Sequence, residues 1–210
     1  MATETSLIKK SRGRPKVFDR EDALEKAMAL FWQHGYEATS LSHLVEATGA
    51  KAPTLYAEFT NKEGLFRAVL DHYIARFAKK HEAQLFAAGK AIEQALEEYL
   101  LAIAHCFTDK DTPSGCFIVC TSSALAASSQ DIAATIRERH AVQQEMLLLF
   151  LNEHQQRGTL PEGCNTQHLA RYLCCIIRGM SVNARDGASY EDLASIVKTT
   201  IMLLPELKKQ

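Results

Sequence analysis

The sequence predicts an all-α protein of about nine helices, with a small three-helix N-terminal domain followed by a larger helical domain. Alternating β-branched runs, which are typical of strands, are nearly absent. Ala, Leu, Glu, Gln and Lys, which favour helices, dominate the 210 residues. Glycines, prolines and cap residues divide the chain into segments of helical length. A chain of this length can bury a core in one or two domains.

The first three helices are expected before residue 60. In residues 20–34 the apolar side chains form one helical stripe, and Gly35 is expected to end this helix as its C′ residue. Ser40 is placed to cap a second helix, LSHLVEAT, which Gly49 ends. A third helix is expected over residues 52–59. Two short helices joined by a tight turn have the dimensions of a helix-turn-helix, a DNA-reading motif.

The later helices follow from caps and breaks. Thr60 to Glu63 is expected to form a capping box at the start of a long helix over residues 62–86. The segment DKDTPSG, residues 109–115, is the clearest internal loop. Further helices are expected at about 90–107, 116–127, 130–157, 166–184 and 190–204.

Positive charge is concentrated near the N-terminus. Residues 9–16, KKSRGRPK, carry five positive charges and no negative one, although the formal net charge of the chain is −1. A local basic segment on a neutral body is typical of an arm that contacts nucleic-acid phosphates. We therefore expect residues 1–18 to be a basic flexible arm.

Composition also bounds the location. No apolar run approaches the roughly 20 residues of a membrane span, and the N-terminus lacks the apolar core of a signal peptide. We therefore expect a cytoplasmic protein with no membrane partner, whose six cysteines are reduced rather than paired.

The second helix of a helix-turn-helix enters the major groove, so Lys51 to Tyr56 hold the first candidates for DNA contacts. Lys51 can donate to guanine or to a phosphate, and Thr54 to a base edge or a phosphate. Lys62 begins the next helix, whose N-terminus attracts a phosphate. The alternative is an ordinary helical hairpin with a polar surface, and the basic arm argues against it.

From Ala27 to Leu65 the chain resembles the TetR family of one-component transcriptional regulators. The resemblance rests on FWQHGYEATS, LVEATGAKAPTLYAEF and TNKEGLF. It implies a TetR-like fold, with a DNA-binding domain at residues 19–66 and a ligand-sensing and dimerisation domain at residues 67–210. It also implies a repressor that binds double-stranded operator DNA and that an effector releases from this DNA. DNA contacts are implied for Thr39, Lys51, Ala52, Pro53, Thr54, Tyr56 and Lys62.

Glu58 departs from the family, which often has His at this position. A carboxylate there would repel a nearby phosphate. We therefore expect Glu58 to point away from DNA or to accept a hydrogen bond from a cytosine N4.

The basic arm contains Arg12-Gly13-Arg14-Pro15, which resembles the core of an AT-hook. An extended Arg-Gly-Arg can lie in the narrow minor groove of A·T-rich DNA, so Arg12 and Arg14 are predicted DNA contacts. The alternative is a disordered basic tail that adds only non-specific attraction.

The resemblance implies that the last two helices pair with their symmetry mates in a four-helix bundle. Their apolar surface exceeds what one small core requires. We therefore expect a homodimer that reads a pseudo-palindrome. The predicted interface residues are Leu173, Ile176, Ile177, Met180, Ile196, Ile201 and Leu204.

All six cysteines follow residue 105, and Cys116 and Cys120 are four residues apart on one helix face. With His105 and Cys106 they form a predicted metal or redox site, in which soft thiolates suit Cu(I). Within the family the chain most resembles copper-responsive repressors, including its arm and DTPSGCF. Copper is thus a candidate effector, and no obligatory cofactor is expected.

Two other sensors stay open. Cys116 is expected in the first turn of a helix, where the helix dipole lowers a thiol pKa and favours reaction with oxidants or electrophiles. An apolar effector between helices is the other candidate, and free cysteines are also common as small buried hydrophobes. The expected apolar lining is Phe66, Tyr73, Phe77, Phe107, Phe117, Met146 and Phe150.

An all-helical enzyme that uses a cysteine nucleophile or a metal is the alternative from a different class. The sequence has no convincing Ser/His/Asp order, no phosphate-cradling Gly loop and no HExxH. We therefore expect a regulator and not an enzyme.

Overall fold

The computed structural model describes residues 18–122, 125–127 and 129–209, and it confirms the all-α prediction. The described residues hold nine helices when the continuous run from α4 to α5 is taken as one. The predicted arm contacts Arg12 and Arg14 lie outside the described residues. The elements are α1 (Arg20–Ala38), α2 (Leu41–Thr48), α3 (Ala52–Phe59), α4 (Lys62–Tyr73), η1 (Ile74–Ala78), α5 (Lys79–Leu85), α6 (Ile92–Phe107), α7 (Phe117–Ser122), α8 (Gln130–Gln156), α9 (Thr166–Arg185) and α10 (Tyr190–Leu207).

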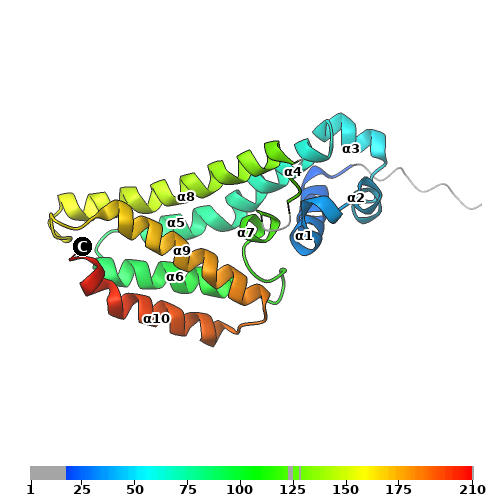
Figure 1. Ribbon diagram of the computed structural model, residues 1–210. Coiled ribbons are helices and arrows are strands. Elements are labelled where there is room, and N and C mark those ends of the chain that lie inside the picture. Colours follow the sequence, from blue (N-terminus) through cyan, green and yellow to red (C-terminus); the bar gives the residue numbers. More distant parts are fainter. Residues whose placement is uncertain (1–17, 123–124, 128, 210) are drawn as a thin grey trace, which may run out of the picture.

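Helices α1 to α3 gather at one end of an elongated molecule, and the long helices extend away from them (Figure 1). In the extended part, α6 packs against α10, and α8 packs against α9. Among the described residues, no helix is both long enough and apolar enough to cross a bilayer.

The N-terminal helices begin where the sequence predicts. The Asp19 carboxylate caps α1, and the Ser40 hydroxyl caps α2 by accepting from the His43 N–H. Gly35 is a kink rather than a stop, because it adopts φ 80° and ψ 170° and the chain then continues helically to Ala38.

The predicted Thr60 to Glu63 capping box is wrong by one residue. Thr60 ends α3 with φ 69°, and its N–H donates to the Tyr56 carbonyl oxygen at 2.8 Å. An N-cap residue usually has an extended backbone, so Thr60 cannot also cap α4. Asn61 takes that role, and its side chain accepts from the Gly64 N–H at 2.8 Å.

The long helix predicted over residues 62–86 contains a wider π turn, Ile74–Ala78, between α4 and α5. Such turns occur often at functional sites. Here the turn contributes Ile74, Phe77 and Ala78 to the wall of a cavity.

Two hydrophobic clusters form the core. One joins α6, α8, α9 and α10, and the other surrounds Phe31, Trp32 and Phe66 at the end that carries α1 to α3. Phe117 of α7 is fully buried in the second cluster. The expected domain boundary at residue 66 falls inside α4, so packing continues across it.

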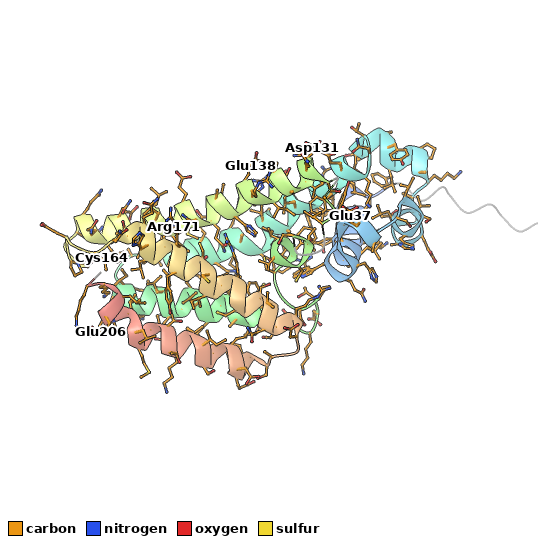
Figure 2. The ribbon with its side chains drawn as sticks, in the orientation of Figure 1. Glu37, Asp131, Glu138, Cys164, Arg171 and Glu206 are labelled. Atoms are coloured by element: carbon orange, nitrogen blue, oxygen red, sulfur yellow. The ribbon has the colours of Figure 1, made fainter. Side chains whose placement is uncertain are left out.

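Polar contacts also join the two ends of the molecule. Arg185 of α9 donates to the carbonyl oxygens of Trp32 and Gln33 at 2.9 and 3.0 Å. Glu37 of α1, labelled in Figure 2, accepts a hydrogen bond from the Ala126 N–H at 3.1 Å. These hydrogen bonds link α9 and the segment before α8 to α1.

Candidate nucleic-acid interface and sensor cavity

Helix α3 presents an exposed face that includes several predicted DNA contacts. Lys51 and Pro53 are exposed, and Tyr56 is 43% exposed. Leu55 and Phe59 are buried on the opposite face and hold the helix on the core. The predicted contacts Ala52 and Thr54 are half-buried along its flanks. The helix can therefore enter a groove as one rigid unit.

Lys62 lies beside this helix at the N-terminus of α4. Its Nζ is 4.3 Å from the centre of the Tyr36 ring, a cation–π contact that orients the ammonium. Burial lowers the pKa of Lys62, and the Glu37 carboxylate opposes that shift. In the first turn of α4 the Gly64 N–H donates to Asn61, whereas the N–H groups of Lys62 and Glu63 have no carbonyl partner within the helix. Ammonium and N–H groups together can bind a phosphate.

Thr39 does not face outward as expected for a DNA contact. Its side chain is fully buried, and its hydroxyl donates to the Gly35 carbonyl oxygen at 2.7 Å. The hydroxyl thus satisfies a carbonyl that the kink at Gly35 frees from the helix. The prediction of a side-chain contact with DNA is corrected for this residue.

Glu58 is paired within the protein. Its Oε1 accepts a hydrogen bond from Nε of Arg20 at 2.7 Å. Arg20 is not among the residues predicted from the sequence, because 38 residues separate it from Glu58 and only the fold brings the two side chains together.

The predicted dimer interface divides into two groups. Leu173, Ile177, Met180 and Leu204 are each at most 2% exposed, so they belong to the core of the protomer and are unavailable to a partner. The prediction is corrected for these four, because the strongest apolar stripe of each helix faces its own domain. Ile176, Ile196 and Ile201 are half-buried at the edge of that core. The outward surface of α9 and α10 carries Cys175, Gly179, Val182, Met202 and Leu203.

A cavity of about 170 Å³ lies between the α4–η1–α5 run, α6, α7 and α8. Of the predicted apolar lining, Tyr73, Phe77, Phe107 and Met146 face this cavity. The other three, Phe66, Phe117 and Phe150, belong to the hydrophobic clusters instead.

His140 adds a polar group to this apolar wall. Its Nε2 is buried and has no hydrogen-bond partner among the described residues. Burial lowers the pKa of His140, and the nearby Arg178 charge lowers it further, which favours the neutral imidazole. Since buried polar atoms are normally satisfied, a ligand with one hydrogen-bonding group would complete this site.

Cys106 and Cys116 both line the cavity. The Tyr73 hydroxyl donates to Sγ of Cys116 at 3.5 Å, and the Cys116 N–H donates to the Ser181 hydroxyl at 2.8 Å. Burial raises the pKa of the Cys106 thiol to about 11, and charge on Cys116 adds to that shift. Two thiols thus share one largely apolar space.

The expectation of a lowered pKa for Cys116 is wrong. This residue precedes α7 instead of lying in its first turn. Burial raises the pKa of the thiol and outweighs the lowering by the Tyr73 hydroxyl and by the N–H groups of Val119 and Ile118. Desolvation disfavours the thiolate more than a short helix end favours it.

The four predicted metal or redox residues are not gathered in one place. His105 is exposed, with its ring 6.1 Å from that of Tyr190, whereas Cys106 faces the cavity. The thiol of Cys120 donates to the Ser114 carbonyl oxygen at 3.7 Å. In the part of the chain that the structure describes, no group of three or more His, Cys, Asp or Glu side chains could hold a metal ion. Of the four predicted residues, Cys106 and Cys116 line the cavity.

Gly115 fixes the approach of the chain to Cys116. It has φ 83°, and an added Cβ would lie 2.7 Å from the Ser181 carbonyl oxygen. We expect Gly115→Ala to lower the free energy of unfolding by about 2 kcal/mol or more, because backbone strain and a close contact combine. Urea unfolding followed by circular dichroism measures this loss.

Gly89→Ala is the matched control for this prediction. Gly89 has φ 84°, but nothing lies within 4 Å of an added Cβ. The free energy of unfolding of Gly89→Ala should therefore fall only by the cost of the left-handed conformation, about 1 kcal/mol. Equal losses in both variants would contradict the close-contact argument.

Comparisons with known proteins agree with this geometry. A family model described as "Bacterial regulatory proteins, tetR family" matches residues 23–69. The chain is 64% identical to the HTH-type transcriptional repressor ComR of Escherichia coli (strain K12), over 100% of both chains. It is 29% identical to the HTH-type transcriptional repressor BdcR of the same organism, over 87% of each chain. A cysteine variant of the TetR family regulator CifR, solved with 26-bp operator DNA, is 30% identical, with a TM-score of 0.85 over 90% of this chain and 98% of that chain.

Proposed function

Because the chain belongs to the tetR family of bacterial transcriptional regulators, we propose that it binds a pseudo-palindromic operator as a homodimer and leaves it when an effector binds. It is a repressor that binds operator DNA, and not an enzyme. A bacterial repressor must reach DNA to act, so we propose that the protein lies in the cytoplasm. The single observation that supports this function best is the exposed face of α3 beside Lys62.

The outward surface of α9 and α10 supports the proposed dimer. Met202 is 71% exposed and Val182 is 50% exposed, which leaves apolar area for a second copy to cover. Two-fold symmetry places two α3 helices against two half-sites about one helical turn of DNA apart. The half-sites would then be inverted copies of one another.

The cavity supports release by an effector. Its wall includes Tyr73 at the end of α4 and Ile118 in α7, so an occupant contacts elements that pack against α1. An effector that binds best to a conformation with another spacing of the two α3 helices, one that does not fit the operator, shifts the population toward that conformation. Operator affinity then falls by the difference in binding free energy between the two states.

Copper is the effector that we place first. The chain resembles copper-responsive repressors, and Cys106 and Cys116 share the cavity. A thiol-based response to oxidants or electrophiles is the second candidate, carried by the same two thiols. An apolar molecule that hydrogen-bonds to His140 is the third.

Fluorescence anisotropy tests these alternatives. Reduced protein is titrated at fixed salt onto the DNA upstream of its own gene, with and without Cu(I). Release by Cu(I) that Cys106→Ser or Cys116→Ser abolishes would support copper. Tight binding that ignores Cu(I) but yields to an oxidant would support the second candidate. Failure of the reduced protein to bind this DNA or any operator selected from random sequence would contradict the proposed function.

The raised pKa of Cys116 predicts slow alkylation at neutral pH. Only the thiolate reacts, and burial raises the pKa above the ordinary value of 9.0. At pH values below that pKa, the rate of Cys116 alkylation by iodoacetamide should rise about tenfold for each unit by which the pH increases. Cys175, which is exposed, should react first at pH 7. Peptide mass spectrometry over time measures both rates, and faster labelling of Cys116 at pH 7 would contradict its desolvation.

A further inference from the structure

An ion pair between Arg20 and Glu58 lies on one flank of α3. Nε of Arg20 and Oε1 of Glu58 are 2.7 Å apart, and the two side chains are 56% and 38% exposed. Exposed pairs of this kind contribute little to stability. Its place at the end of the recognition helix therefore points to a role other than folding.

Two contacts hold the Arg20 guanidinium in one orientation. Its carbon lies 5.4 Å from the centre of the Phe59 ring, and its Nε is bonded to Glu58. The Phe59 ring is itself fixed, because it is buried and packs edge-on against Phe18 at 6.5 Å. Within the described residues, the two terminal NH₂ groups of Arg20 have no hydrogen-bond or ion-pair partner. A guanidinium has five N–H donors, so these groups are available to an outside acceptor.

This guanidinium lies beside the flank of α3 that carries Glu58. Lys51, Thr54 and Glu58 are spaced i, i+3 and i+7, so they share one flank of the helix. Tyr56 projects from the other flank, because successive residues turn by about 100°. A helix in the major groove has a phosphate backbone on either side. With α3 in the major groove, Arg20 would therefore lie beside the phosphate backbone that borders the flank of Lys51 and Thr54.

An unpaired Glu58 on this flank would repel a nearby phosphate. The ion pair with Arg20 offsets the charge of that carboxylate.

We propose that Arg20 binds a phosphate of the operator and that Glu58 is the positioning residue that aims its guanidinium. Two parallel N–H donors match two phosphate oxygens. This inference rests on the proposed function, because it takes α3 as the helix that enters the groove. It assigns Glu58 a partner within the protein in place of a cytosine N4.

The test compares Arg20→Ala, Glu58→Gln and the double variant in operator binding from 50 to 300 mM salt. Arg20→Ala should weaken binding about tenfold per protomer and reduce the slope of log K against log salt by about one per protomer. Glu58→Gln keeps an acceptor for Arg20 and should bind within about threefold of the wild type. The double variant should bind more tightly than Arg20→Ala, because it lacks the unpaired carboxylate.

Arg157→Ala is the matched control. Arg157 forms an exposed pair with Glu153 at 3.1 Å, at the end of α8 far from α3 (Figure 1). This variant should keep the wild-type affinity and salt slope. Melting temperatures of all variants separate loss of folding from loss of a DNA contact.

Three results would overturn the proposal. A wild-type salt slope in Arg20→Ala would make the pair structural, even if its melting temperature fell. A loss of more than tenfold in Glu58→Gln, confined to operators with one particular base pair, would make Glu58 a base reader. If the wild type and Arg157→Ala also failed to bind DNA, the proposed function would fail as well, and this outcome is distinct from the other two.

Discussion

Replacing Lys62 with alanine is expected to weaken operator binding by about 100-fold or more while the protein stays folded. A hydrogen bond to a charged group contributes about 1.5–3 kcal/mol, and a dimer would lose one in each protomer. Since 1.4 kcal/mol corresponds to a factor of ten, the two losses multiply. The Tyr36 ring 4.3 Å from Nζ holds the ammonium in place, so little ordering is needed on binding.

Fluorescence anisotropy at fixed salt measures the loss for Lys62→Ala, and circular dichroism checks the fold. Lys80→Ala is the control, because Lys80 is an exposed lysine of α5 in the same continuous helical run. It should bind like the wild type. An affinity of Lys62→Ala within threefold of the wild type would remove this ammonium from the phosphate contacts.

Local signals in the sequence predict the elements of this fold well, because caps and apolar stripes act within one or two turns. Ser40 and Gly49 bound α2 as expected. These cap signals do not identify the cap residue where two candidate caps are adjacent, as at Thr60 and Asn61. Which residue caps α4 depends on how α3 ends, and the cap motif alone does not contain that information.

Contacts between distant segments account for the other differences. The apolar stripe of α9 is visible in the sequence, but Leu173 and Ile177 pack within the protomer rather than on a partner. Periodicity identifies an apolar face and not what covers it. The partner of Glu58 was missed for the same reason, because Arg20 lies 38 residues away.

The sensor residues show how helix geometry separates neighbours in sequence. His105 and Cys106 are consecutive, yet a helix turns by about 100° per residue. His105 is therefore exposed, while Cys106 faces the cavity. Sequence proximity favoured one cluster of four ligands, whereas the fold brings only Cys106 and Cys116 of that set to the cavity. The sign of the Cys116 pKa shift also depends on burial, which spacing does not reveal.

Phe117 is the side chain through which we expect the cavity to act on the DNA-binding helices. It is fully buried, with ring centroids 6.1 Å from Trp32, 5.6 Å from Phe66 and 5.4 Å from Tyr73. The next residue of α7, Ile118, lines the cavity. Phe117→Ala should lower the free energy of unfolding by about 3–5 kcal/mol, which urea unfolding measures.

The smaller change Phe117→Leu separates coupling from stability. It should retain the fold and operator binding, but reduce several-fold the ratio of operator dissociation constants with and without effector. Phe150→Leu is the control, since Phe150 is equally buried in the other hydrophobic cluster. It should lose similar stability and keep that ratio. An unchanged ratio in both variants would contradict a role of Phe117 in the coupling between the cavity and the DNA-binding helices. The coupling would then depend on the contacts of Arg185 with α1, because these contacts join the same two ends of the molecule without involving α7.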